Sequence, residues 1–153
     1  MNDSKNLGSV NYQKIDLTVV CLANSINILM ALLFLARMIG LTELENTFGI
    51  AVITMGFALG YIAYLNKKNR RDKWETYLLI PIFLFMIIEL ILDYIVVLDF
   101  RNTIIHGPYI LLYYIGAWAL IGYSFRFEKK WGFITLGTYF IMMILSIYPY
   151  VIK

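Results

Sequence analysis

Five long apolar segments occupy most of this chain, and they constrain its fold more than any other feature does. A helix of about 20 apolar residues is long enough to cross the hydrocarbon core of a bilayer. These runs are unbroken rather than alternating in polarity, so they predict helices and not the strands of a membrane barrel. We therefore expect an all-α integral membrane bundle of five transmembrane helices. The segments run from about Asp16 to Ile39, Thr47 to Leu65, Tyr77 to Leu98, Pro108 to Phe125 and Trp131 to Tyr148.

Composition and length support one membrane domain. The chain has 153 residues, is 61% hydrophobic and has a mean hydropathy of +0.73, whereas soluble domains are about 45–50% apolar. We expect residues 1–14 to form a short polar tail and residues 15–153 a single five-helix transmembrane domain. The first apolar run continues to Leu35, which predicts an uncleaved helix rather than a signal peptide. Cys21 is the only cysteine, so no disulfide can form within the chain.

Basic residues are concentrated in alternate connections between the segments. By the positive-inside rule this pattern places the N-terminus in the cytoplasm and the C-terminus outside. Such short runs beside apolar helices predict topology rather than nucleic-acid binding, so the expected partner is the lipid bilayer of the cell membrane. The residues on the predicted cytoplasmic side are Lys5, Lys14, Lys67, Lys68, Arg70, Arg71, Lys73, Arg126, Lys129 and Lys130.

The third segment carries two carboxylates, Glu89 and Asp93, deep within its apolar run. They are four residues apart, so a helix places both on one face. An acid in hydrocarbon costs several kcal/mol unless it is partnered, hydrated or protonated. The rest of the molecule is therefore expected to close over these two side chains.

The first segment offers partners for that acidic face. At about 1.5 Å per residue, Asn27 lies about 18 Å from the cytoplasmic edge, level with Glu89. Asn24 shares a helix face with Asn27, and Arg37 lies at the outer boundary above Asp93. We predict that the Asn24/Asn27 face packs against the Glu89/Asp93 face, with Arg37 at the outer mouth.

Three interpretations of this polar centre remain open. The acids could join helices through hydrogen bonds, with Asp93 paired to Arg37. They could bind or transport a cation, proton or small molecule, with Glu89 as the switchable acid, Asp93 as the second ligand and Arg37 as a gate pair or anion clamp. They could act as metal ligands or general bases on a lipid substrate. In the first case the protein would be a non-catalytic subunit or anchor, and in the third a membrane enzyme.

The remaining sequence features are less specific. Gly56-x-x-x-Gly60 permits close helix approach, either to a second chain or partner protein or to a neighbour in the same bundle. His106 precedes Gly107-Pro108 in an outer loop and is expected to be solvated. No phosphate loop, zinc-ligand spacing or nucleophile elbow is present, so the sequence predicts no particular cofactor, metal or catalytic residue.

Helix boundaries follow from local signals. Thr42 with Glu45 resembles a capping box ahead of the second segment, and Asp72 with Glu75 resembles one ahead of the third. Pro81 allows two alternatives. It bends the third helix if that helix begins near Lys73, and it is a first-turn residue if the helix begins near Leu79.

Overall fold

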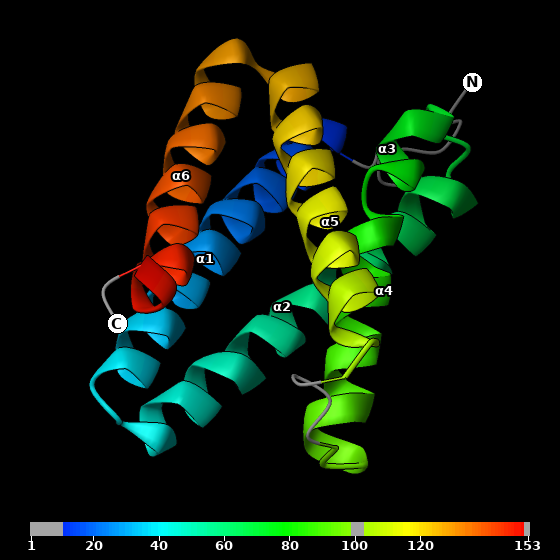
Figure 1. The fold of residues 1–153 in the computed structure, drawn as a ribbon. Coiled ribbons are helices and arrows are strands. Elements are labelled where there is room, and N and C mark those ends of the chain that lie inside the picture. The colour runs from blue at the N-terminus through cyan, green and yellow to red at the C-terminus, as the bar shows by residue number, and fades with distance from the viewer. Residues whose placement is uncertain (1–10, 99–102, 152–153) are drawn as a thin grey trace, which may run out of the picture.

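The computed structural model describes residues 11–98 and 103–151. Within those residues the chain is helical and contains no strand, as the apolar segments predicted. Figure 1 shows the elements, which are α1 (Tyr12–Met38), α2 (Thr42–Lys68), α3 (Lys73–Tyr77), α4 (Ile80–Glu89), η1 (Leu90–Ile95), α5 (His106–Phe127) and α6 (Lys129–Val151). Residues 1–10 of the predicted tail, including Lys5, lie outside the described residues. α1 begins at Tyr12, and the Asn11 side chain caps it.

Five helices are long and apolar enough to cross a membrane. The third is the combined run Lys73–Ile95, and the fifth extends from Lys129 to Tyr148. Each predicted segment corresponds to one of the five helices, which begin two to five residues earlier than the hydropathy pattern suggested. The first and third predicted segments, to Ile39 and Leu98, continue past the ends of their helices at Met38 and Ile95. The architecture is therefore compatible with a polytopic membrane protein.

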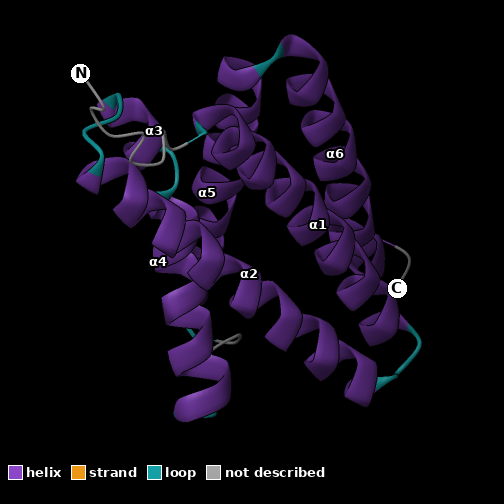
Figure 2. Cartoon of the chain, turned by 180° about the vertical axis from the view of Figure 1, so that it is seen from behind, coloured by secondary structure: helices purple, strands orange, loops and turns teal. Residues whose placement is uncertain are grey.

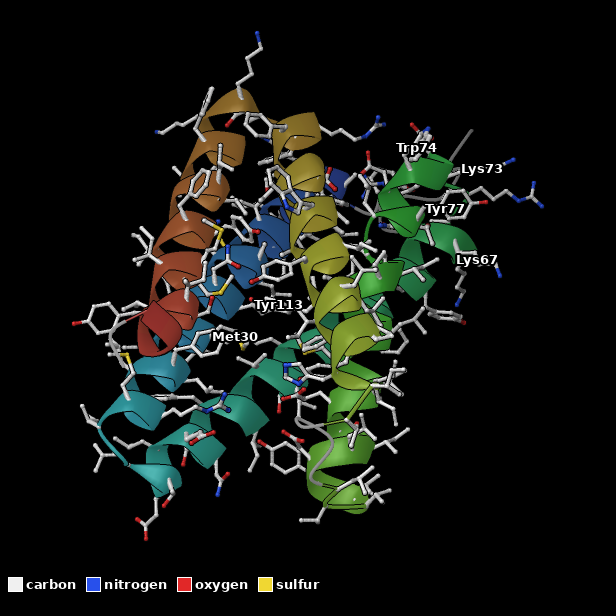
Figure 3. All side chains as sticks on the ribbon, in the orientation of Figure 1. Met30, Lys67, Lys73, Trp74, Tyr77 and Tyr113 are labelled. Carbon is white, nitrogen blue, oxygen red and sulfur yellow. The ribbon has the colours of Figure 1, made fainter. Side chains whose placement is uncertain are left out.

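The helices form two hairpins that contact each other through α1 and α6, and the broken third span packs beside α2 and α5. α1 packs against α2 and α6, α5 packs against α4 and α6, and α2 also contacts α4. Figures 1 and 2 show α3, the α5–α6 turn and the start of α1 at one end of the bundle, with the α1–α2 turn and η1 at the other. We call the first the basic end, because it holds the charged stretches Lys67–Lys73 and Arg126–Lys130. Figure 3 shows Lys67, Lys73, Trp74 and Tyr77 together there.

Large apolar side chains cover the outside of the bundle. Ile50 on α2, Leu111 on α5, and Phe133 and Ile141 on α6 are each more than half exposed. A soluble monomer rarely exposes contiguous apolar surface on this scale, whereas a bilayer requires it. The outer surface therefore agrees with the hydropathy of the five helices.

The turn between α1 and α2 is fixed by its backbone. Gly40 has a φ of +75°, and the N–H groups of Gly40 and Leu41 donate to the carbonyls of Arg37 and Ala36. These two hydrogen bonds form a Schellman motif. Glycine is favoured there because it has no Cβ and adopts the left-handed conformation without steric cost. The predicted Thr42–Glu45 capping box is wrong, since α2 has Leu41 at its N-cap with no side-chain bond. The Glu45 carboxylate instead accepts a hydrogen bond from Nε of Arg37 across this turn.

The third span is discontinuous. Asp72 caps α3 by accepting a hydrogen bond from the backbone N–H of Trp74 at 3.3 Å. The run then breaks at Leu78 and Leu79, so Pro81 lies in the first turn of α4, as the second alternative predicted. Beyond α4 the helix widens into the π-helix η1, which contains Asp93. Such π-segments are rare and frequently mark functional sites.

Glycines seat the third span against its neighbours. A Cβ added at Gly56 would lie 2.2 Å from Cγ of Met86, and one at Gly60 would lie 2.4 Å from Cε2 of Phe83. The Gly56-x-x-x-Gly60 pattern of α2 therefore serves close packing against α4 within the same chain, one of its two predicted uses. Association with another chain or partner stays a prediction.

Candidate functional site

A cavity of about 400 Å³ opens between helices in the half of the bundle away from the basic end. α1 contributes Met30, Phe34 and Arg37, and α4 contributes Phe85 and Glu89. Figure 3 shows Met30 of α1 and Tyr113 of α5 in the middle of the bundle, on either side of this space. The rest of the wall comes from Leu33, His106, Tyr109, Ile110, Tyr113, Tyr114, Ser146 and Ile147. We call this space the aromatic cavity.

Rings in mutual contact form one continuous side of the aromatic cavity. The ring of Phe85 lies 5.0 Å from that of Tyr109 and 5.0 Å from that of Tyr113. Tyr113 continues to Tyr114 at 5.6 Å, and Tyr109 to His106 at 6.4 Å. These separations are within the 4.5–7 Å typical of aromatic pairs. The cavity therefore has a stiff apolar wall with polar atoms at its edges.

A second cavity of about 600 Å³ adjoins the first. The two share Leu33, Arg37 and Glu89, so these side chains form the partition between them. The second cavity is more polar, and we call it the acidic cavity. Its other lining residues are Glu45, Asn46, Gly49, Ile50, Asp93, Tyr94, Val97 and Leu98.

Glu89 and Asp93 lie at the point where the third span changes from α-helix to π-helix. Glu89 is the last residue of α4, and Asp93 lies inside η1. Both side chains are half-buried and line the acidic cavity, and Glu89 also lines the aromatic cavity. The structure thus brings both predicted acids to an internal space.

The predicted contact between the asparagines and the acids is wrong. Asn24 and Asn27 face α6, where Nδ2 of Asn24 donates to Oγ1 of Thr135 and Nδ2 of Asn27 donates to Oγ1 of Thr138, each at 3.0 Å. The Thr138 hydroxyl donates in turn to Oδ1 of Asn24 at 3.0 Å. Two amides and two hydroxyls with the same three-residue spacing satisfy one another without charge. Equal depth in the bilayer is not sufficient to predict which helix the asparagines contact. The rotation of α1 about its axis directs their face to α6.

Arg37 also has a different partner from the predicted one. Its Nε donates to Oε1 of Glu45 at 2.8 Å, and Nη2 binds the same oxygen, so the pair bridges the α1–α2 turn. The guanidinium lies 5.9 Å from the centre of the Phe34 ring. Arg37 therefore lines both cavities while bound to Glu45 rather than to Asp93.

His106 was wrongly expected to be a solvated loop residue. It is the first residue of α5, half-buried, and lines the aromatic cavity with Glu89. The helix begins two residues before Pro108, so the histidine points to the bundle instead of the loop. The Tyr113 hydroxyl, from the next turns of α5, donates to the sulfur of Met142 at 3.2 Å.

A largely buried polar cluster, which the sequence did not reveal, lies at the basic end. Arg71 binds both carboxylate oxygens of Asp16 at 2.8 and 2.9 Å, and its Nη1 also donates to Oδ1 of Asn66 at 3.1 Å. The Tyr123 hydroxyl donates to Asp16 at 2.6 Å. We call these four residues the basic-end cluster. It joins α1, α2, the α2–α3 connection and α5, with Asn66 and Tyr123 fully buried.

Charge pairing dominates the behaviour of Arg71. Burial works to lower its pKa, but the hydrogen bond and charge of Asp16 outweigh this and raise the pKa above its ordinary value. A cation whose folded-state pKa is raised contributes full stability below its unfolded pKa and loses it only as pH rises through the folded pKa. Arg71 therefore stays charged throughout the neutral range, and only substitution can remove this charge.

Two further observations bear on chemistry. Among the described residues, no three His, Cys, Asp or Glu side chains are close enough together to hold a metal ion. No protein-family model, curated protein or solved structure matches this chain. Function therefore has to be inferred from the two cavities and their surroundings.

Proposed function

We propose that this chain is a multi-pass membrane protein that binds a small molecule in the two cavities and carries it across the membrane. The observation that carries the proposal is the pair of adjoining cavities, which meet at Glu89 in the half away from the basic end. If the basic end is cytoplasmic, as the positive-inside rule predicts, the cavities face outward. The basic-end cluster then closes the cytoplasmic side.

The form of the third span supports transport rather than a static anchor. It is interrupted at Leu78 and Leu79 and widened from Leu90 to Ile95. Irregular backbone at membrane depth is tolerated where it is buried in protein or lines a cavity. Discontinuous helices beside a central site are typical of secondary transporters, in which they help one half of the bundle to move.

The lining residues suggest roles within this proposal. Glu89 forms part of the wall of both cavities, so it is the acid that would meet a ligand passing between them. Asp93 would be the second ligand in the acidic cavity. Arg37, held by Glu45, would be a gate pair at the outer mouth. A non-catalytic anchor would use none of these groups, and a lipid enzyme would need Glu89 and His106 to act on a bound ester.

Cysteine accessibility tests the proposed pocket and its orientation. In a Cys21→Ala background, Ser146→Cys places a thiol in the aromatic cavity, while Ile144→Cys places one on the exposed apolar face of the same helix. A charged, membrane-impermeant thiol reagent is applied to oriented vesicles from each side. We expect Ser146→Cys to react only from the side opposite the basic loops, and Ile144→Cys to react from neither, since a thiol in hydrocarbon does not ionise.

The same assay tests movement. Asp16→Asn weakens the basic-end cluster and should allow Ser146→Cys to react from the basic side as well. An inert Ser146→Cys, or one that reacts equally from both sides before Asp16 is changed, would contradict the proposed one-sided pocket. Unchanged one-sided labelling after Asp16→Asn would show that the cluster is not the closure and would refute this part of the proposal.

A further inference from the structure

We infer that the basic end carries a binding site for the phosphate headgroup of an anionic phospholipid, on the surface formed by the end of α2 and the start of α3. Four exposed cations define this surface, which we call the α2–α3 basic surface: Lys67, Lys68, Arg70 and Lys73. Figure 3 shows Lys67 of α2 and Lys73 of α3 on the same side of the bundle. The surface lies away from the two cavities, so its ligand does not depend on what they bind.

The acids near this surface are already held by other cations. Arg126 of α5 contacts the carboxylate of Asp72 at 2.8 Å and that of Glu75 at 3.6 Å. Arg71 binds the carboxylate of Asp16 at 2.8 Å. Within the part of the chain that the structure describes, no ion pair involves any of the four cations of the α2–α3 basic surface. Their positive charge is therefore available to an anion from outside the chain.

The acids outside the described residues do not reverse the sign of this surface. They are Asp3 and Asp99, and a cation follows each of them two residues later in the sequence. These cations are Lys5 and Arg101, so neither segment adds net negative charge. Even if both acids approached the surface, they would neutralise only two of its four cations.

One face of α2 changes from apolar to cationic toward the basic end. Its exposed side chains include Phe57, Tyr61, Tyr64 and Lys68. Their spacing of four, three and four residues places them on one side of the helix. At about 1.5 Å per residue, Lys68 lies about 6 Å beyond Tyr64 along the axis. Hydrocarbon, aromatic belt and charged headgroups follow one another in the same order through one leaflet of a bilayer.

Two exposed aromatic pairs adjoin the cations. The rings of Tyr61 and Tyr64 stack at 6.5 Å, and those of Trp74 and Tyr77 on α3 meet edge to face at 6.3 Å. Each of the four rings is more than half exposed. Tyrosine and tryptophan concentrate at the headgroup level of membranes. A phosphate bound by the lysines would therefore have its glycerol and acyl chains beside these rings, which favours a membrane lipid over a nucleic acid.

The turn that carries the cations has a fixed backbone. Arg70 has a φ of +53°, and the N–H of Arg71 donates to the carbonyl of Asn66 at 3.0 Å. The Arg71 side chain is anchored in turn by Asp16 and Asn66. A residue other than glycine persists in the left-handed region only where its surroundings hold it there. The cations at the ends of α2 and α3 therefore keep fixed relative positions, which a specific site requires and a signal for orientation alone does not.

Lipid titration followed by native mass spectrometry tests the inference. The purified full chain in a neutral detergent is titrated with phosphatidylglycerol and with phosphatidylcholine of identical acyl chains. We expect the first phosphatidylglycerol to bind at least about fivefold tighter than the first phosphatidylcholine. Glycerol-3-phosphate, which has a phosphate but no acyl chains, should not displace phosphatidylglycerol at equal concentration.

Paired double variants locate the binding. Lys67→Gln with Lys73→Gln removes two charges from the α2–α3 basic surface, while Lys129→Gln with Lys130→Gln removes two from the α5–α6 turn at the same end. All four lysines are exposed, so thermal unfolding in the same detergent should not change. The first variant should bind phosphatidylglycerol about tenfold more weakly and phosphatidylcholine as before, whereas the second should bind both lipids as the native chain does. Lys67→Arg with Lys73→Arg keeps the charge and should preserve binding.

The contrary outcomes are distinct. Equal binding of the two phospholipids would overturn the inference, and an equal loss in both glutamine variants would show diffuse attraction to the whole basic end instead of a site. Displacement by glycerol-3-phosphate at equal concentration would assign the surface to a soluble phosphate compound. Displacement by a short single-stranded DNA, lost in Lys67→Gln with Lys73→Gln, would assign it to a nucleic acid. The labelling of Ser146→Cys tests the proposed function separately from all of these.

Discussion

The basic-end cluster predicts a strong, specific coupling between Asp16 and Arg71. The two side chains are only 15% and 12% exposed, and they meet through bonds of 2.8 and 2.9 Å. The perturbation is a double-mutant cycle with Asp16→Asn, Arg71→Gln and the double variant. A matched cycle uses Asp72 and Arg126, an ion pair of 2.8 Å at the same end whose side chains are 54% and 43% exposed.

The expected magnitude follows from burial and geometry. Two unit charges about 4 Å apart attract by about 4 kcal/mol at an effective dielectric constant of 20, and the cost of removing both ions from water offsets part of this. Removing one partner of a buried pair costs about 3–5 kcal/mol, because the other charge is left unpaired. The Tyr123 hydroxyl at 2.6 Å adds a third bond to Asp16. We therefore expect a coupling energy of about 2–3 kcal/mol for Asp16 with Arg71, and about 0.2–1 kcal/mol for Asp72 with Arg126.

The assay is reversible unfolding in mixed detergent micelles at neutral pH, with the free energy of unfolding measured for each variant. A low-salt and a high-salt series adds a second criterion, because exposed pairs are screened far more than buried ones. A coupling energy for Asp16 and Arg71 no larger than that of the exposed pair would refute the buried, closing role of the cluster.

Three further predictions concern packing and the cavities. Gly116→Ala should cost about 1–3 kcal/mol of stability, because its Cβ would lie 2.9 Å from Cα of Ile82; Gly137→Ala, with nothing within 4 Å, should cost none, and thermal unfolding of both decides. Asn27 and Thr138 should show a coupling of about 0.6–1.7 kcal/mol in a double-mutant cycle, whereas Asn27 and Glu89 should be additive; the reverse would restore the abandoned contact. Met30→Trp should fill the aromatic cavity and block reaction of Ser146→Cys with the impermeant thiol reagent, while Leu32→Trp, outside both cavities, should leave that reaction intact; equal labelling in both variants would contradict a reagent path through the cavity.

The fold could be predicted from the sequence because a bilayer-crossing helix is a local property. About 20 apolar residues are sufficient, and each segment satisfies this condition without reference to any other. Helix starts could also be predicted where the effect of a residue is local: Asp72 caps α3, and Pro81 lies in the first turn of α4. Thr42 failed as a cap, since a residue two places earlier, Gly40, had already set the turn.

The site was predictable only in part, since it depends on how the helices rotate about their axes. Asn27 and Glu89 are at the same estimated depth, yet the asparagine faces α6. A usable signal was present: Asn24 and Asn27 have the same three-residue spacing as Thr135 and Thr138. Matching polar spacings on two helices is a stronger criterion than matching depth.

The basic-end cluster lay beyond what one sequence can show. Asp16 and Arg71 are 55 residues apart, and each alone resembles an ordinary charge at a membrane edge. Arg71 was counted only as one of several loop cations. Only the packing of α1 beside α5 and the α2–α3 connection brings the carboxylate, guanidinium and phenol together.

The π-helix η1 has a mechanical consequence for the two acids. A turn of this kind holds one residue more than a regular turn, so it can shift along a helix by exchanging one set of backbone bonds for the next. When such a shift passes a residue, that residue rotates by about 100° around the helix axis. This is the angle between successive residues at 3.6 residues per turn. If the wide turn moved toward Pro81, Glu89 would swing out of its present direction while the start of α4 stayed seated on Gly60. Deleting Leu92 removes the extra residue; unchanged one-sided labelling of Ser146→Cys in that variant would show that this rotation has no part in shaping the cavities.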